Sequence, residues 1–192
     1  MKKNNKYLAA TAIGVCAVIA LFTMASRFDM TASIQDVPAR TSPADLAQLA
    51  NFTRINVDGD FDLEVSQLQD YSIEFQPLSE TQGELVARVE DDTLIVTGYA
   101  NRSETAAAVV RIGVPVLDTL EVSSLPEITV SNFNAPLMNI QLKAFRSFTL
   151  ENSVITTLNL SSEGRGEINL RGNTLTTQNL RLDEESELNV ID

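Results

Sequence analysis

The chain has no histidine and a single cysteine among its 192 residues, and these absences exclude several kinds of chemistry. Ser-His-Asp and Cys-His nucleophile systems need a histidine base, and histidine-ligated zinc needs an imidazole. Cys16 has no second cysteine to join, so Cys-rich zinc sites and intrachain disulfides are excluded too. We identify no catalytic residue, no cofactor-binding residue and no metal-binding residue, and we expect a protein that is not an enzyme.

Basic residues are also few, with 14 lysines and arginines against 26 acidic residues. The first 26 residues hold three of the lysines and no acid, which leaves 11 basic and 26 acidic side chains, a charge of −15, on the remainder. Such a field repels phosphate backbones and anionic headgroups, so we expect no nucleic-acid partner. It favours solubility or, alternatively, attraction to cations or to a basic partner.

Residues 1–26 have the pattern of a signal anchor. Lys2, Lys3 and Lys6 precede the uncharged stretch 7–26, which as a helix would span about 30 Å and cross a membrane. The lysines predict a cytoplasmic N-terminus, a single pass through the cytoplasmic membrane, and residues 27–192 in the periplasm or outside the cell. The alternative is a cleaved signal peptide and secretion, because residues 23–25 offer small side chains near a possible cut.

Residues 27–51 are polar, contain Pro38 and Pro43, and are predicted to form a tether. Ser42, Pro43 and Asp45 provide an N-cap, a proline at the first helical position and an acid in the first turn, so a short helix is expected there. Its expected role is to cover the first rung of the folded domain, 52–192.

Four copies of one short strand pattern recur at intervals of 20 residues and predict a repeating β structure. They are Glu127-Ile128-Thr129-Val130, Ser147-Phe148-Thr149-Leu150, Glu167-Ile168-Asn169-Leu170 and Glu187-Leu188-Asn189-Val190. A second set of apolar pairs lies between them, so that each rung holds two short strands: Leu120/Val122, Ile140/Leu142, Leu158/Leu160 and Leu180/Leu182. Stacked rungs would bury each other's apolar faces in columns, so no rung is expected to fold alone.

Strict alternation from Ile55 to Val65 predicts a half-buried strand before the repeats begin at Leu117. Further strands are expected at 71–75, 85–89, 94–97 and 107–114, with 90–93 as a hairpin turn. We therefore predict an all-β fold: a short β-solenoid, or stack of parallel β-helix-like repeats, preceded by antiparallel strands and one N-terminal transmembrane or signal helix. Asn132, Asn152 and the pair Gly172-Asn173 are expected to form an asparagine-rich corner, with left-handed backbone and stacked amides.

Several of these segments together resemble the bacterial putative auto-transporter adhesin, head GIN domain family. The resemblance covers about residues 51–192 and rests on Phe52-x-x-Ile55-x-Val57-x-Gly59-x-Phe61, Tyr71-Ser72-Ile73-Glu74-Phe75, Asp92-Thr93-Leu94-Ile95-Val96 and Val110-Arg111-Ile112-Gly113-Val114-Pro115-Val116-Leu117 with Leu120-Glu121-Val122-Ser123. It implies a β-rich, repeated domain of the cell envelope and transfers no catalytic residue. This chain has Ser123-Ser124-Leu125-Pro126-Glu127 where the family often has glycines.

Two groups of charged residues are candidate sites. Asp58, Asp60, Asp62 and Glu64 form a predicted carboxylate row on one strand face, for which a solvated surface is favoured over calcium because neighbours lie about 6 to 7 Å apart. Glu151 and Arg171 lie one rung apart and could pair across about 4.8 Å; a surface ladder pair is favoured over part of a polysaccharide-cleaving site.

The last strand, Asn189-Val190-Ile191-Asp192, has no polar cap after it and is predicted to accept a partner strand. The favoured function is a non-catalytic binding or structural module of the cell envelope, whose partner is another envelope protein, a second copy of this chain docked at this rung, or a glycan. The alternatives are an envelope sensor or scaffold acting through a membrane partner, and a carbohydrate-active enzyme.

Overall fold

The computed structural model of the chain describes residues 49–76, 84–99 and 108–191, and in these ranges the fold is all-β, as predicted. The predicted anchor at 7–26 and the predicted helix that starts at Ser42 lie outside the described residues. No helix among the described residues has the length and apolar character needed to cross a membrane. The described strands are β1 (Arg54–Gly59), β2 (Asp62–Gln67), β3 (Ser72–Gln76), β4 (Glu84–Glu90), β5 (Thr93–Tyr99), β6 (Val109–Val114), β7 (Thr119–Ser131), β8 (Asn134–Glu151), β9 (Val154–Ser162), β10 (Gly166–Arg171), β11 (Thr174–Arg181) and β12 (Ser186–Ile191).

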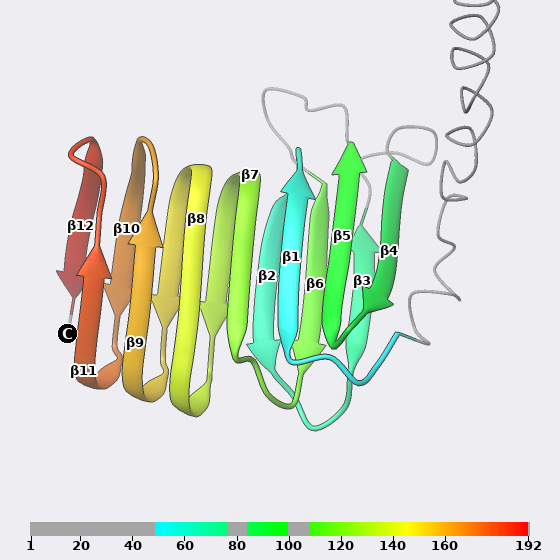
Figure 1. Cartoon of the computed structure of the whole chain (residues 1–192), viewed down its shortest axis with the longest axis horizontal. Coiled ribbons are helices and arrows are strands. Elements are labelled where there is room, and N and C mark those ends of the chain that lie inside the picture. Colours follow the sequence, from blue (N-terminus) through cyan, green and yellow to red (C-terminus); the bar gives the residue numbers. More distant parts are fainter. Residues whose placement is uncertain (1–48, 77–83, 100–107, 192) are drawn as a thin grey trace, which may run out of the picture. The chain divides into compact units, whose positions relative to one another are not determined.

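The strands lie on two faces of a coil (Figure 1). On one face the order is β4, β5, β1, the first part of β7, the first part of β8, β9 and β11. On the other face the order is β3, β6, β2, the second part of β7, the second part of β8, β10 and β12. Strands β1, β5, β9 and β11 point one way in Figure 1, and β2, β6, β10 and β12 point the other way, as successive turns of a coil require.

The 20-residue period of the sequence is the register of the sheet after residue 118. Thr119 pairs with Asn139 and Glu127 with Ser147, both in parallel, and Glu167 pairs in parallel with both Ser147 and Glu187. Each interval of 20 residues is therefore one full turn of the coil. Parallel pairing at constant register places chemically similar side chains directly above one another.

Apolar side chains fill the coil in continuous columns. One column runs through six strands and consists of Leu94, Ile55, Leu120, Ile140, Leu160 and Leu180. Its first five members are buried, and the sixth, in β11, is only partly buried. Each member is covered by the turn on either side of it, so burial is complete only inside the stack.

The first half of the chain is less antiparallel than its pattern predicts. Strand β3 pairs antiparallel with β6, and β4 pairs antiparallel with β5, as expected. The prediction is wrong for β1 and β2, which pair in parallel with both of their neighbours and form a turn of the coil between β5–β6 and β7. Alternation shows which side chains face inward, but it is the same in parallel and antiparallel strands.

The predicted single strand from Ile55 to Val65 is two strands on different faces. Gly59 ends β1, and a side chain there would meet the ring of Phe61 and the carbonyl oxygen of Gly98. Phe61 is buried, and β2 then continues with the same inward phase through Leu63 and Val65. The alternation passes unchanged around the corner, which is why it conceals the break.

Left-handed residues mark the turns, as predicted. Asn132, Asn152 and Gly172 have φ angles of 63°, 51° and 57°. No hydrogen bond joins the side chains of Asn132 and Asn152, and the Asn132 amide instead donates to Ser131 Oγ at 3.3 Å. The expected amide ladder therefore does not form at this corner.

An amide ladder exists elsewhere, on the outer side of β8, β9 and β11. Asn179 Nδ2 donates to Asn159 Oδ1 at 2.7 Å, and Asn159 Nδ2 donates to Asn139 Oδ1 at 2.8 Å. Asn139 Nδ2 in turn donates to the carbonyl oxygen of Asp118 at 3.1 Å. The three asparagines recur every 20 residues, a signal that was present in the sequence and was missed.

Candidate functional site

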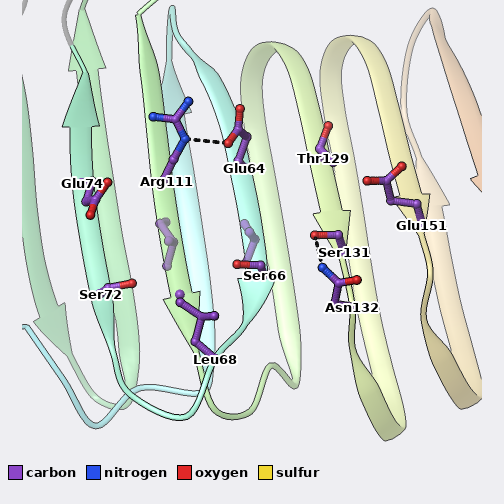
Figure 2. Close-up of a pocket in the computed structure, with 13 residues that line it drawn as sticks. Glu64, Ser66, Leu68, Ser72, Glu74, Arg111, Thr129, Ser131, Asn132 and Glu151 are labelled. Carbon is purple, nitrogen blue, oxygen red and sulfur yellow. Dashed lines mark hydrogen bonds and ion pairs between the residues drawn. The ribbon is translucent and has the colours of Figure 1, made fainter.

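A groove of about 510 Å³ lies on the outer side of β3, β6, β2, β7 and β8 (Figure 2). It is defined here as the β3–β8 groove. Its lining is mostly polar: Glu64, Val65, Ser66, Leu68, Ser72, Glu74, Arg111, Ile112, Gly113, Thr129, Ser131, Asn132 and Glu151.

Strand register arranges most of this lining in two rows that cross the strands. The first row contains the longer side chains, because Glu74 pairs with Arg111, Arg111 with Glu64 and Glu64 with Thr129. The second row, two residues away, consists of Ser72, Gly113, Ser66, Ser131 and Glu151. Four of the five residues in the second row are serine or glycine, so the surface is lower there.

Leu68 adds an apolar contact surface to this low row. A side chain built at Gly113 would clash with Leu68 Cδ1 and Ser72 Oγ. Gly113 therefore leaves the space that both side chains use, and Leu68 covers it while remaining 48% exposed. The groove thus combines hydroxyls with one exposed aliphatic side chain.

The positively charged side chain in the lining of the groove, Arg111, already forms hydrogen bonds with other protein side chains. Arg111 Nε donates to Glu64 Oε2 at 2.8 Å (Figure 2). Arg111 Nη1 donates to Gln76 Oε1 at 2.8 Å. The carboxylates of Glu74 and Glu151 form no ion pair with any described residue. The groove therefore carries an excess of negative charge, which disfavours anionic ligands.

The predicted carboxylate row does not exist as one row. Asp58 lies on β1 and Glu64 on β2, so the corner at Gly59 places the two acids on different faces of the coil. Glu64 is the one member that lines the β3–β8 groove. Within the described ranges, no group of three or more acidic, cysteine or histidine side chains could hold a metal ion.

Glu151 and Arg171 are neighbours in the sheet, as predicted from their spacing. They pair in register between β8 and β10, and Asn152 N donates to the Arg171 carbonyl oxygen at 3.1 Å. Among the described residues, their side chains form no ion pair. Glu151 instead lines the end of the groove.

The β11–β12 turn of the coil is the second candidate surface. Strand β11 pairs only with β9, and β12 pairs only with β10, so each has one edge without a described partner. The inward column Ile112, Val65, Val130, Leu150 and Leu170 is at most 2% exposed, whereas Val190, the next member, is 61% exposed. This turn presents part of an apolar core to solvent.

The β3–β8 groove could not be found from the sequence, because its residues come together only through strand pairing. Glu64 and Thr129 are 65 positions apart, and no short motif contains them. The parallel register of β11 and β12 on the preceding turn, by contrast, follows from the repeat pattern and was predicted.

A protein family matches most of the chain. The family model described as "Putative auto-transporter adhesin, head GIN domain" matches residues 51–192. No curated protein matches the chain.

Among solved structures, a putative adhesin from Parabacteroides distasonis ATCC 8503 is similar in fold, with 12% identity and a TM-score of 0.54. The similarity covers 75% of this chain and 62% of that one, so this chain matches less than two thirds of its relative. A putative adhesin from Bacteroides fragilis NCTC 9343 has 9% identity and a TM-score of 0.29 over 74% of this chain and 94% of that one.

Proposed function

The chain belongs to the putative auto-transporter adhesin, head GIN domain family, and we propose that residues 52–192 form a short β-solenoid that acts as a non-catalytic binding or structural module of the cell envelope. The family name supports a binding role, and it carries over no catalytic residue. The absence of histidine from the whole chain removes the commonest general base.

The observation that carries the proposal is the exposed β11–β12 turn. Val190 and Ile191 are 61% and 49% exposed in β12. This strand pairs in parallel with β10, and its other edge has no described partner, so a further strand could pair with it there. An edge of this kind binds a partner strand through main-chain hydrogen bonds, with apolar side chains extending the columns. The proposed function is therefore docking of a partner by strand addition at this turn.

Charge favours another protein over a second copy of this chain as the partner. Asp183, Glu184, Glu185 and Glu187 lie beside the exposed edge, and of these Glu185 is paired with Arg165 at 3.2 Å. Two copies joined at this turn would bring these acids together, and like charges opposite one another are destabilising. A strand that carries lysine or arginine would be attracted.

The test is photocrosslinking from a reactive amino acid at position 189, in the full-length chain and in native membranes, followed by mass spectrometry of the adducts. We expect one recurrent envelope protein, and loss of that adduct when Val190→Lys is introduced. The matched control is Val154→Lys, because Val154 is 53% exposed at the start of β9 and away from the edge. An adduct with the same chain would replace the proposed partner by self-association, and no protein adduct would contradict docking at this edge.

We also propose that residues 7–26 remain as an uncleaved anchor that holds residues 27–192 on the outer side of the cytoplasmic membrane. The uncharged stretch and the three preceding lysines support this placement. Protease added to intact spheroplasts should digest residues 27–192, and alkaline extraction should leave the chain in the membrane. Release of a shortened chain into the soluble fraction would instead support a cleaved signal peptide.

A further inference from the structure

We propose that the β3–β8 groove binds a neutral oligosaccharide. This inference deepens the binding role proposed above and rests on the domain being a binding module, but it uses a different surface from the β11–β12 turn. It is carried by the groove's form and by the chemistry of its lining.

The lining of the groove extends across the strands from β3 to β8. Between Glu74 on β3 and Glu151 on β8 there are four strand intervals, which amount to about 19 Å at roughly 4.8 Å each. The low row of serines and glycine runs along this direction, and the longer side chains of the first row form one wall. An elongated ligand that lies across the strands fits this form better than a single sugar ring.

The lining offers hydrogen-bonding groups of the kinds that hydroxyl-rich ligands need. Ser66, Ser72 and Ser131 can each donate and accept, and carboxylates such as Glu151 accept from hydroxyl donors. A sugar hydroxyl both donates and accepts, so it can be satisfied at every interval of the row. Leu68 supplies an apolar surface against which the C–H groups of a sugar ring can pack.

The other ligand classes fit less well. An anionic ligand would meet Glu74 and Glu151 without a free cation among the described lining residues, because Arg111 is held by Glu64 and Gln76. An added peptide strand needs an unpaired sheet edge, and here β6, β2, β7 and β8 are each paired on both sides. Among uncharged ligands, one rich in hydroxyls fits the serine row. A cationic ligand would also be attracted by Glu74 and Glu151, and the cationic members of the array below separate the two classes.

The hydrogen bonds that join Glu64, Arg111 and Gln76 preorganise the first row of the groove for binding. Both hydrogen bonds are 2.8 Å long and come from one guanidinium, so its plane is held before any ligand arrives. Fixing a polar side chain in advance lowers the ordering cost of binding.

The proposal is tested on an array of short oligosaccharides with the described domain intact in the full chain. The array should contain neutral hexose and N-acetylhexosamine chains, uronic acid chains and cationic glucosamine chains. We expect binding to neutral members and little change in affinity between low and high sodium chloride, because an uncharged ligand is not subject to screening. Binding to the acidic or cationic members alone would overturn the proposal.

Two groove variants and two matched controls locate the site. Ser66→Leu fills the low row and Glu151→Gln removes a charged acceptor, and each should weaken binding by about tenfold. Ser161→Leu, on the opposite face, and Glu163→Gln, at the turn after β9, make the same changes away from the groove and should leave affinity unchanged. Equal losses in the controls, or none in the groove variants, would overturn the assignment.

Failure of the oligosaccharide proposal and failure of the strand-docking proposal would give different results. If no glycan binds while the adduct at position 189 still forms, the groove assignment is wrong and the binding module remains. If a glycan binds at the groove without any protein adduct, docking at the β11–β12 turn is wrong and the groove assignment stands.

Discussion

Individual side chains have different structural roles according to the side of the strand from which they project. Phe148 points inward and is fully buried, whereas Asn159 points outward and takes part in two side-chain hydrogen bonds. Ser153 is buried at a turn, where its hydroxyl accepts from Phe133 N at 3.0 Å and donates to the Glu151 carbonyl oxygen at 2.9 Å. The buried hydroxyl is thus satisfied, which removes the usual cost of burying a polar group.

The amide ladder gives a graded prediction at this scale. Asn159→Ala removes two hydrogen bonds and should lower the free energy of unfolding by about 1–2 kcal/mol, whereas Asn179→Ala removes one and should cost about half as much. Urea unfolding followed by circular dichroism measures both. Thr177→Ala, in the same strand as Asn179, is the control for a change in strand propensity, and a cost equal to that of Asn159→Ala would contradict a role for the ladder.

The interior columns predict a larger effect. Phe148→Asp places an unpaired carboxylate at a fully buried position and should destabilise the domain by roughly 4 kcal/mol or more. The measurement is thermal melting of the full chain. Arg146→Asp, at the exposed position two residues earlier, should change stability by about 0.5 kcal/mol or less, and a Phe148→Asp variant that melts near the parent temperature would refute the column.

At the scale of the element, the strands are bounded by residues that accept a left-handed backbone. Asp91 and Asp92 have φ angles of 45° and 64° and form the two-residue turn between β4 and β5, as the sequence predicted. Asp92 also reaches the start of β1, where its carboxylate accepts from Thr53 N at 3.1 Å and from Thr53 Oγ1 at 2.9 Å. One turn residue therefore shapes a hairpin and fixes the end of a distant strand.

Glycine substitutions separate these two roles. Asp91→Gly should leave stability unchanged or raise it by up to about 1 kcal/mol, because glycine adopts a positive φ without steric cost. Asp92→Gly gains the same backbone freedom but loses both bonds to Thr53, so a net loss of about 1 kcal/mol is expected. Chemical denaturation of both variants is the measurement, and equal stabilities would show that the contact with Thr53 contributes nothing.

At the scale of the whole described domain, stability should vary along the coil. Strands β7 and β8 are paired on both edges and carry fully buried columns, whereas β11 and β12 have one paired edge each, and their apolar residues are partly buried or exposed. A stack in which each turn contacts only its neighbours loses order from its ends. The turn proposed to dock a partner is therefore also the least protected one.

Hydrogen exchange with mass spectrometry tests this gradient. Amides of β11 and β12 should exchange first and those of β7 and β8 last, and a bound partner strand should slow exchange at β12 because it covers the free edge. Uniform protection from β1 to β12 would mean that the domain opens only as one cooperative unit.

The sequence by itself determined the all-β class, the 20-residue turn of the coil, the inward columns after residue 118 and the hairpin turn at Asp91 and Asp92. These features are local or periodic, because the identity of a side chain is enough to decide whether it faces the core and where the backbone must turn. The amide ladder of Asn139, Asn159 and Asn179 belongs to the same class, since it repeats at the same interval.

Only the tertiary structure decided which strands are neighbours. It inserted β1 and β2 between β5–β6 and β7, split the acids from Asp58 to Glu64 between two faces, and brought Glu74, Arg111, Glu64 and Thr129 into one row. Alternation is identical for every possible pairing partner, so it cannot choose among strands as much as 65 residues apart. That choice depends on which arrangement buries all the columns together, and the β3–β8 groove is its consequence.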